Sequence, residues 1–247
     1  MNNLLISKIY NILFENDYLT VLFDRLNDND KKIYKPIISE DKLTIDYRKI
    51  PLIFDNTNKE NKNFQFYNGK IYVGKNKNYF KDIIKYNYEK LENEHDYIQW
   101  LFPNRVKSNY NNNSVTLQEN EINVFKTNKE IKNKIIASIK LMLDFYGFHI
   151  KNDNILPHDK SDERFNNLIE NTHNNLRISR ILFFLGDLDM IYYQYRFLYA
   201  LYYEIFITEK LEKLKSSFIQ YWIHSIKDDN QRNDFKIIVL QTIISKK

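Results

Sequence analysis

The chain has 247 residues with four Gly, four Pro and no Cys, and its formal net charge is +5. Because Gly and Pro permit most sharp chain reversals, their scarcity favours a mainly α fold: a single multi-helix domain rather than a strand-rich barrel. The lack of Cys excludes disulfides, thiolate nucleophiles and Cys-based zinc sites, and it fits a cytoplasmic or nuclear compartment. The mild basic charge permits an anionic partner without requiring one.

Apolar residues at helical spacing predict two short helices at the start of the chain, residues 3–14 and 17–26. The polar run 27–32 ends the second helix. Pro36 and Pro51, followed by a polar run to residue 63, predict irregular chain over residues 33–63. We therefore expect an N-terminal helical and irregular appendage, residues 1–60, followed by a helical domain, residues 61–247.

The dipeptide Asn68-Gly69 carries the strongest β signal. Asn-Gly supplies the positive φ angles of a two-residue hairpin turn, and the apolar segments 64–67 and 70–73 flank it. We expect at most one small β-hairpin, at this position. The alternative is an extended loop packed on helices.

From residue 79 onward the periodicity predicts helices. The predicted ranges are 79–91, 94–102, 128–146, 162–170, 173–185, 190–209, 212–226 and 229–244. Residues 148–160 are predicted to be a loop. Capping-box spacing begins at Thr116 and again at Thr127, and Gly147 suits the αL position after a helix. The predicted core contains Trp100, Leu101, Ile139, Met142, Ile181 and Leu182.

The most apolar window of the chain, residues 191–207, contains Gln194, Arg196 and Glu204. A membrane span needs about 20 mostly apolar residues, and central charges are costly there. We therefore predict a buried helix in this window and no transmembrane segment.

His173, Arg177 and Arg180 are spaced i, i+4 and i+7, so they share one face of the predicted helix 173–185. Three potential cations on one face suit a phosphate or a carboxylate, because Arg binds such groups through two parallel hydrogen bonds. The structural alternative is that the arginines pair with acidic neighbours such as Asp187 and Glu94.

His95 and Gln99 lie one turn apart beside Trp100, and we place them in the same candidate ligand-binding site, together with Asn174. The His95-Asp96 pair invites comparison with metal phosphohydrolases. Those sites need another His upstream, and His95 is the first histidine of the chain. We therefore predict no metal site and no cofactor.

Other common signatures are absent from the sequence: there is no Gly-rich phosphate loop, no nucleophile elbow and no His-Glu-x-x-His helix. No nucleic-acid-binding motif is present either, so we do not expect a nucleic-acid partner. The residues themselves suggest a small anionic ligand as the partner, and a protein partner is also compatible with the sequence.

Residues 95–103, His-Asp-Tyr-Ile-Gln-Trp-Leu-Phe-Pro, resemble the HSYIQWLFP signature of the opioid growth factor receptor conserved region. Later segments follow in the same order. Residues 141–147 are similar to the family's LMLGFYG segment, and residues 163–182 are similar to its RFxNL and SHNNLRITRIL segments. The resemblance spans roughly residues 64–242. Asp96 stands where the signature has Ser, and the Asn-rich loop after residue 103 departs from the family pattern.

The resemblance implies a mostly helical fold. Animal members of this family bind an enkephalin-type pentapeptide, restrain cell proliferation and reside in and around the nucleus. Our leading hypothesis is therefore a non-enzymatic, receptor-like peptide-binding module with a role in growth regulation, located in the cytoplasm or at the nucleus. The alternative is a hydrolase or binder of a phosphorylated small molecule or nucleotide, in which His95 or His173 acts as acid and base. That alternative requires the two histidines to converge in one cleft.

Overall fold

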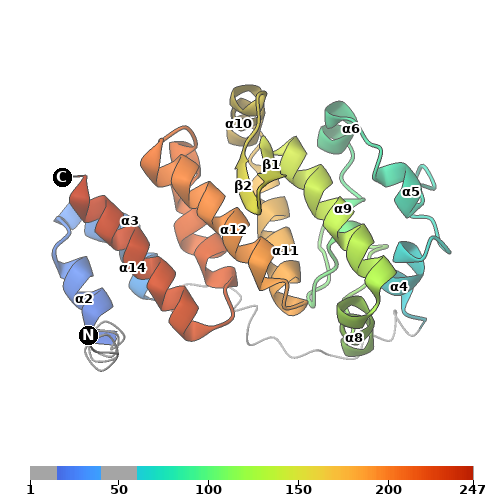
Figure 1. Ribbon diagram of the computed structural model, residues 1–247, viewed down its shortest axis with the longest axis horizontal. Coiled ribbons are helices and arrows are strands. Elements are labelled where there is room, and N and C mark those ends of the chain that lie inside the picture. The colour runs from blue at the N-terminus through green and yellow to red at the C-terminus, as the bar shows by residue number, and fades with distance from the viewer. Residues whose placement is uncertain (1–15, 40–59, 247) are drawn as a thin grey trace. The chain divides into compact units, whose positions relative to one another are not determined.

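The computed structural model describes residues 16–39, with side chains from residue 19, and residues 60–246 (Figure 1). The fold is mainly α, with one two-stranded antiparallel sheet among the described residues, which confirms the predicted fold class. These residues form two compact units. Unit 1 contains residues 16–39 and 198–246, unit 2 contains residues 60–197, and the boundary falls within helix α12 (Ile191–Tyr202).

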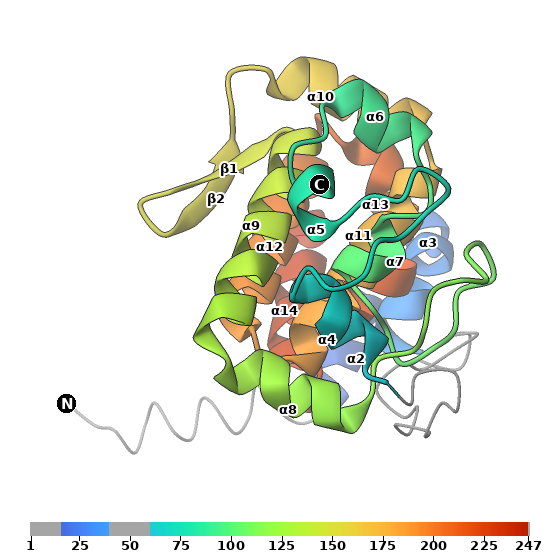
Figure 2. The same cartoon turned by 90° about the vertical axis from the view of Figure 1, so that its right-hand side faces the viewer.

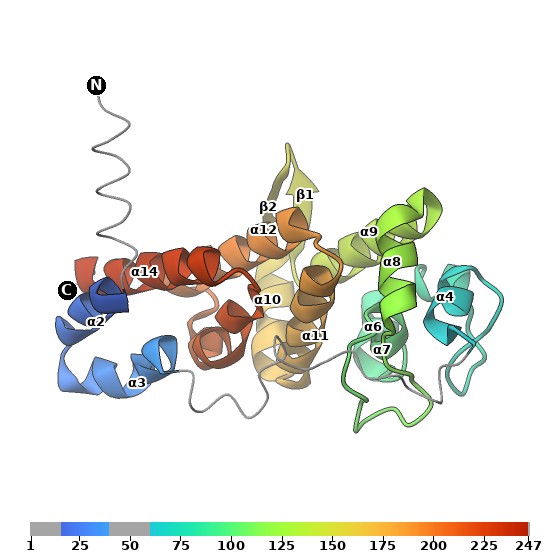
Figure 3. The ribbon, with the colours of Figure 1, turned by 90° about the horizontal axis from the view of Figure 1, so that it is seen from below.

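Unit 1 is built from short helical pieces and one long C-terminal helix. Its elements are α2 (Asn16–Asp24), α3 (Asp28–Ile38), η2 (Tyr203–Ile207), η3 (Glu212–Leu214), α13 (Lys215–Ser217), η4 (Phe218–Trp222), η5 (Ile223–Ser225) and α14 (Asp229–Ser245). Helix α2 packs against both α3 and α14 (Figure 3). The predicted helix 229–244 is confirmed as α14. The predicted helix 190–209 is α-helical only from residue 191 to residue 202 and continues as the π-helical turn η2 to residue 207. The predicted helix 212–226 is instead interrupted, with two 3-10 turns and a π-helical turn in it.

The prediction of irregular chain directly after residue 32 is wrong, because helix α3 continues to residue 38. The Oδ1 atom of Asn27 accepts a hydrogen bond from the backbone N–H of Asp30 at 2.9 Å, so the polar run is a helix start. Acidic Asp28 and Asp30 in the first turn also favour the positive end of the helix dipole. Pro36 removes one helical hydrogen bond, and the helix ends two residues later. The predicted helix 3–14 lies outside the described residues, as does most of the predicted appendage, residues 1–60.

Unit 2 contains the remaining elements. They are α4 (Lys62–Tyr67), α5 (Phe80–Ile83), α6 (Tyr88–Asn93), α7 (Ile98–Leu101), α8 (Glu119–Thr127), α9 (Lys129–Phe145), β1 (Phe148–Lys151), β2 (Asn154–Pro157), α10 (Ser161–Glu170) and α11 (His173–Asp187). Helix α8 contacts both α4 and α9 (Figure 2).

The predicted hairpin at Asn68-Gly69 is wrong, because this dipeptide ends helix α4. Gly69 has φ +71°, its N–H donates to the carbonyl of Phe66, and the N–H of Lys70 donates to the carbonyl of Gln65, both at 2.9 Å. This pattern closes a helix with a left-handed residue after the C-cap. Asn-Gly suits the end of a helix as well as a hairpin turn. Here the segment before it is helical because the helix, residues 62–67, buries Phe66 and Tyr67.

The sheet lies instead at residues 148–157, within the segment predicted as a loop. Strand β1 pairs with β2 from Phe148 opposite Pro157 to Lys151 opposite Asn154. The turn residues Asn152 and Asp153 have φ values of 47° and 61°, as a two-residue hairpin turn requires. Both residue types tolerate the left-handed region, so the signal for this hairpin was the Asn-Asp dipeptide.

The predicted helix 79–91 consists of two short helices, α5 and α6, because Asn87 is the N-cap of a second helix. The Oδ1 atom of Asn87 accepts from the N–H of Lys90 at 2.9 Å, and the first helix begins where Asp82 accepts from the N–H of Tyr79 at 2.9 Å. The predicted helix 94–102 is also shorter, since only residues 98–101 are helical.

The predicted helix 128–146 is confirmed as α9, and Gly147 follows it with φ +95°. The predicted capping boxes are displaced. Asn128 caps α9 by accepting from the N–H of Ile131 at 3.0 Å, and the carboxylate of Glu121 accepts from the N–H of Gln118 at 3.1 Å at the start of α8.

The core of unit 2 is aromatic. The Phe66 ring lies 5.8 Å from the Trp100 ring, the Tyr67 ring lies 5.2 Å from that of Phe125, and the Phe125 ring lies 6.4 Å from that of Phe184. These contacts join α4, α7, α8 and α11. All six predicted core residues are buried. Within residues 16–39 and 60–246, no helix has the length and apolar character to cross a membrane.

Candidate functional site

The candidate site forms where the start of α11 packs against residues 91–95, at the end of α6 and the beginning of its link to α7. Five side chains meet there, and we call them the Arg177 cluster: Glu92, His95, His173, Asn174 and Arg177. The cluster joins two segments that are about 80 positions apart in the sequence, one of them leading into Trp100 and the other at the start of α11. It lies wholly within unit 2.

Arg177 is the centre of the cluster and is only 5% exposed. Its Nη1 donates to the carbonyl of Leu91 at 2.8 Å, and its Nη2 donates to the carbonyl of Glu94 at 2.9 Å and that of Glu92 at 3.4 Å. The guanidinium also lies 5.5 Å from the centre of the Tyr97 ring. Arg177 therefore holds the chain segment 91–94 by its main chain, which a rigid fork of five donors suits.

Glu92 is the acidic member of the cluster. Its carboxylate accepts a hydrogen bond from the Asn167 amide at 2.6 Å and another from the Asn174 amide at 3.2 Å, and it lies 2.6 Å from Nε2 of His173. The Oδ1 atom of Asn174 in turn accepts from Arg177 at 3.1 Å. A fully buried Asn174 thus links the carboxylate to the guanidinium.

The two histidines form the accessible side of the cluster. Their ring centres lie 5.1 Å apart in an edge-to-face arrangement, His95 is exposed and the His173 side chain is 36% exposed. The Nδ1 atom of His95 lies 3.3 Å from Nη2 of Arg177. Burial lowers the pKa of His173 from 6.5, and the charges of Arg177 and His95 lower it further, whereas Glu92 opposes the shift. His173 is therefore neutral at neutral pH.

The lowered pKa predicts how the stability of the protein depends on pH. The unfolded state binds the His173 proton more tightly than the folded state, so stability should fall as the pH drops below 6.5. We expect the urea midpoint to fall less between pH 7 and pH 5.5 in His173→Gln than in the unmodified protein. Parallel curves for the protein and His173→Gln would contradict this prediction.

The structure brings together four of the six predicted site residues: His95, His173, Asn174 and Arg177. Gln99 is buried elsewhere, with its amide 3.4 Å from both the Ser108 hydroxyl and the Asn111 amide nitrogen, so it holds the loop after α7. Arg180 is half-buried and donates to the carbonyl of Phe102 at 3.3 Å.

The structural alternative paired Arg177 and Arg180 with the side chains of acidic neighbours such as Asp187 and Glu94, and the structure gives these two residues other contacts. Asp187 lies 2.8 Å from Nε of Arg105, and Glu94 meets Arg177 through its main-chain carbonyl. Sequence reasoning missed Glu92 and Asn167, which are 75 positions apart and have no shared motif. The one available signal for Glu92 was its position directly before the segment that carries Trp100.

Acid–base chemistry and metal binding make different demands on this geometry. The rings of His95 and His173 lie 5.1 Å apart, which supplies the proximity that an acid–base pair needs but does not by itself supply the shared cleft. Among residues 16–39 and 60–246, however, no group of three or more His, Asp or Glu side chains is arranged to hold a metal ion.

Together, the fold and the cluster define a class of helical module in which one buried arginine joins two distant sequence segments and leaves a histidine pair at the surface. Residues 56–247 match the family model described as the opioid growth factor receptor conserved region. The chain belongs to the opioid growth factor receptor conserved-region family.

Three relatives illustrate the similarity. The opioid growth factor receptor of Rattus norvegicus is 35% identical over 179 residues, which cover 70% of this chain and 30% of the relative. Opioid growth factor receptor-like protein 1 of Xenopus tropicalis is 37% identical over 175 residues, 69% of this chain and 34% of the relative. The opioid growth factor receptor of Homo sapiens is 32% identical over 188 residues, 73% of this chain and 28% of the relative.

The matched region therefore spans about a third of the length of these relatives. No solved structure matches the chain.

Proposed function

We propose that this protein is a receptor-like binding module for an enkephalin-type peptide, and that the peptide binds at the Arg177 cluster. One observation carries the proposal: the two segments that most resemble the family, residues 95–103 and 172–182, meet at this cluster. The relatives are named receptors of an opioid growth factor. A peptide ligand is the binding partner that such a name implies for this chain.

The proposal gives the side chains two kinds of role. His95 is exposed and His173 is half-exposed, so these two contact the peptide. Their rings can accept or donate one hydrogen bond each and present an aromatic face to a tyrosine or phenylalanine side chain. The Glu92 side chain is 18% exposed beside His173, and its carboxylate suits the ammonium group at the peptide's N-terminus.

Of the other predicted site residues, Asn174, Arg177 and Gln99 position the contacts, and Arg180 makes one. Asn174 and Arg177 are buried and bonded within the cluster, and Gln99 is buried against the following loop. Arg180 is half-buried on the same face of α11, one turn beyond Arg177, and is the cation that we assign to the peptide carboxylate. This changes the expected role of Arg177 from ligand contact to support.

Isothermal titration with a synthetic enkephalin-type pentapeptide tests the proposal. We expect His95→Ala to weaken binding at least about tenfold, a loss of about 1.4 kcal/mol, because an exposed contact is removed without disturbing the core. His149→Ala is the matched control, since it removes a histidine of unit 2 outside the cluster, and its affinity should equal that of the unmodified protein. Circular dichroism confirms that both variants fold.

Two results would overturn the assignment. One is that the peptide does not bind the unmodified protein at millimolar concentration. The other is that His95→Ala and His173→Gln bind as tightly as the unmodified protein. Hydrolysis of a phosphomonoester that disappears in His173→Gln would favour the acid–base alternative, which the 5.1 Å approach of the two rings supports.

The proposal extends to a role in growth regulation and to a cytoplasmic or nuclear location, and family membership supports both. If the module acts as a peptide-dependent growth regulator, the peptide should slow the growth of cells that express the protein. Cells that express His95→Ala should respond less.

A further inference from the structure

A second candidate site lies in unit 1, in a cavity of about 680 Å³ between α3 and the interrupted helical segment 212–221. Three lysines from three elements line it: Lys32 of α3, Lys213 of η3 and Lys215 of α13. The lining also includes the apolar surface of Pro36 and the ring of Tyr221. Small-molecule sites have volumes of about 300–1,000 Å³ and combine apolar walls with a few polar groups, so this cavity is of suitable size and character.

The three lysines differ in whether a neighbouring carboxylate pairs with their charge. Lys215 is half-buried, and its ammonium group lies 3.0 Å from the Glu212 carboxylate. Burial opposes the charge of Lys215, yet the hydrogen bond to Glu212 and the neighbouring Tyr34 raise its pKa overall, so it stays protonated. Lys32 and Lys213 are exposed and, among the described interactions, neither takes part in an ion pair. The cavity therefore carries positive charge that the described residues do not neutralise.

The π-helical turn η4 shapes one wall of the cavity. Phe218, Ile219 and Trp222 are buried in the core of unit 1, whereas Gln220 and Tyr221 are exposed at the cavity. Turns of this type are rare and occur frequently at functional sites. The side chain of Tyr221 is 45% exposed, and it lines the cavity together with Pro36, so it offers a flat ring a face for stacking.

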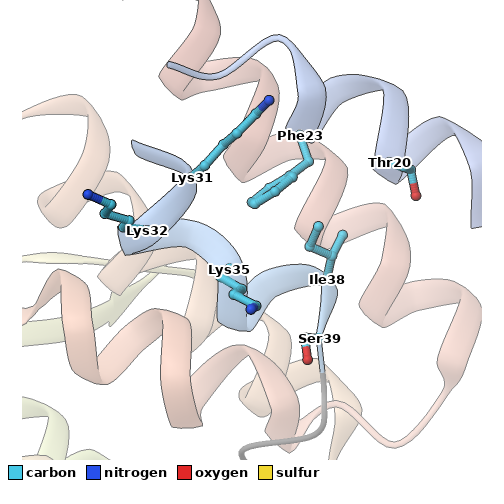
Figure 4. A pocket seen from close by; sticks show the side chains of 7 residues that line it. All are labelled: Thr20, Phe23, Lys31, Lys32, Lys35, Ile38 and Ser39. Carbon is cyan, nitrogen blue, oxygen red and sulfur yellow. The ribbon is translucent and has the colours of Figure 1, made fainter. Parts of the chain in front are cut away.

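A second cavity, of about 500 Å³, is lined by residues of α2 and α3 and by Ser39 (Figure 4). It shares Lys32 and Ser39 with the first cavity. It adds Lys31 and Lys35, and Lys31 lies 3.7 Å from the Asp24 carboxylate. Figure 4 shows Lys31 and Lys32 extending from α3 in different directions. Helix α3 thus contributes lysines to both cavities. The positive charge at the first cavity comes from lysines of more than one element.

We propose that the cavity between α3 and residues 212–221 binds a phosphorylated small molecule with a flat ring, of the nucleotide class. The phosphates are held by Lys32 and Lys213, with Lys215 fixed behind them by Glu212. The ring lies against Tyr221 and Pro36. This site is separate from the Arg177 cluster and does not depend on the function proposed for that cluster.

Isothermal titration with ADP at about 0.15 M salt, which screens diffuse charge attraction, tests the proposal. Lys32→Gln/Lys213→Gln should weaken ADP binding at least about tenfold, because it removes both ammonium groups and keeps the side-chain size. Both positions are exposed, so the variant should remain folded. Lys210→Gln, an exposed lysine of unit 1 outside both cavities, is the matched control and should bind ADP as the unmodified protein does.

Titration with tripolyphosphate, which has phosphates but no ring, separates the contributions of the ring and the phosphates to the affinity for ADP. Tyr221→Ala should weaken ADP by about tenfold and leave tripolyphosphate nearly unchanged, since only ADP has a base to stack. The proposal is overturned if ADP does not bind at millimolar concentration or if the double lysine variant binds ADP with unchanged affinity. It is also overturned if an oligonucleotide or an acidic peptide binds these lysines while ADP does not displace it.

Discussion

Replacing Arg177 with alanine should lower the free energy of unfolding by about 3–5 kcal/mol, the largest loss that we expect from a single polar side chain here. The guanidinium is 5% exposed and satisfies three main-chain carbonyls and the Asn174 amide oxygen. Alanine leaves these acceptors without their donor in a site that water enters poorly, and it also removes the contact with the Tyr97 ring.

Urea unfolding followed by tryptophan fluorescence measures this loss in the unit concerned. Trp100 lies in unit 2 and Trp222 in unit 1, so a Trp222→Phe background makes Trp100 the reporter. Arg177→Lys keeps the charge but not the planar fork, and we expect an intermediate loss. Lys140→Ala, an exposed change on α9, should remain within about 0.5 kcal/mol. A loss below about 1 kcal/mol for Arg177→Ala would show that the arginine is not structural.

This result bears on the peptide-binding proposal. Arg177→Ala should be destabilised and lose peptide affinity whether Arg177 positions the site or contacts the peptide directly. This variant therefore does not distinguish the two roles. His95→Ala separates the two roles, because His95 is exposed and its removal leaves the bonds of Arg177 to the main chain in place. The peptide site is therefore best tested at His95 and the fold at Arg177.

Local signals in the sequence predicted the long elements well. The apolar stripe of α9 and the glycine after it are determined within one segment, so periodicity and a C-cap suffice. The hairpin was misplaced because Asn68-Gly69 and Asn152-Asp153 both permit left-handed backbone, and only burial of the flanking residues decides which pair joins strands. The break at Asn87 was missed because a side-chain cap overrides continuous apolar spacing.

The candidate site was predictable only in part, for a related reason. His173, Asn174 and Arg177 lie on one helix, so their spacing alone places them together. His95 was assigned to the same candidate site from its place beside Trp100, although helical spacing does not relate it to residues 173–177. Glu92 joins the cluster through contacts that span 75 to 82 positions, and nothing in a single sequence reports such a pairing. The burial of Arg177 against main-chain carbonyls depends on the path of residues 91–94, which helical periodicity does not specify.

Glu121 provides the second large effect: Glu121→Ala should lower the free energy of unfolding by about 2–4 kcal/mol. Its carboxylate is 1% exposed and accepts hydrogen bonds from the N–H groups of Asn63, Phe64 and Gln118, at 3.0, 3.2 and 3.1 Å, and from the Asn63 amide at 2.9 Å. Two of these donors are the first N–H groups of α4, so one carboxylate caps α4 and fixes it to α8.

The same Trp100 fluorescence assay measures the loss, and hydrogen exchange at the amides of residues 62–67 shows whether α4 detaches first. Glu119→Ala is the matched control, because Glu119 lies in the same first turn of α8 but is exposed, and it should cost less than about 0.5 kcal/mol. Glu121→Gln should remain well below the unmodified protein, since one of its two carboxylate acceptors becomes a donor facing other donors. Equal stability of Glu121→Ala and Glu119→Ala would mean that aromatic packing alone, through Phe66 and Tyr67, holds α4 in place.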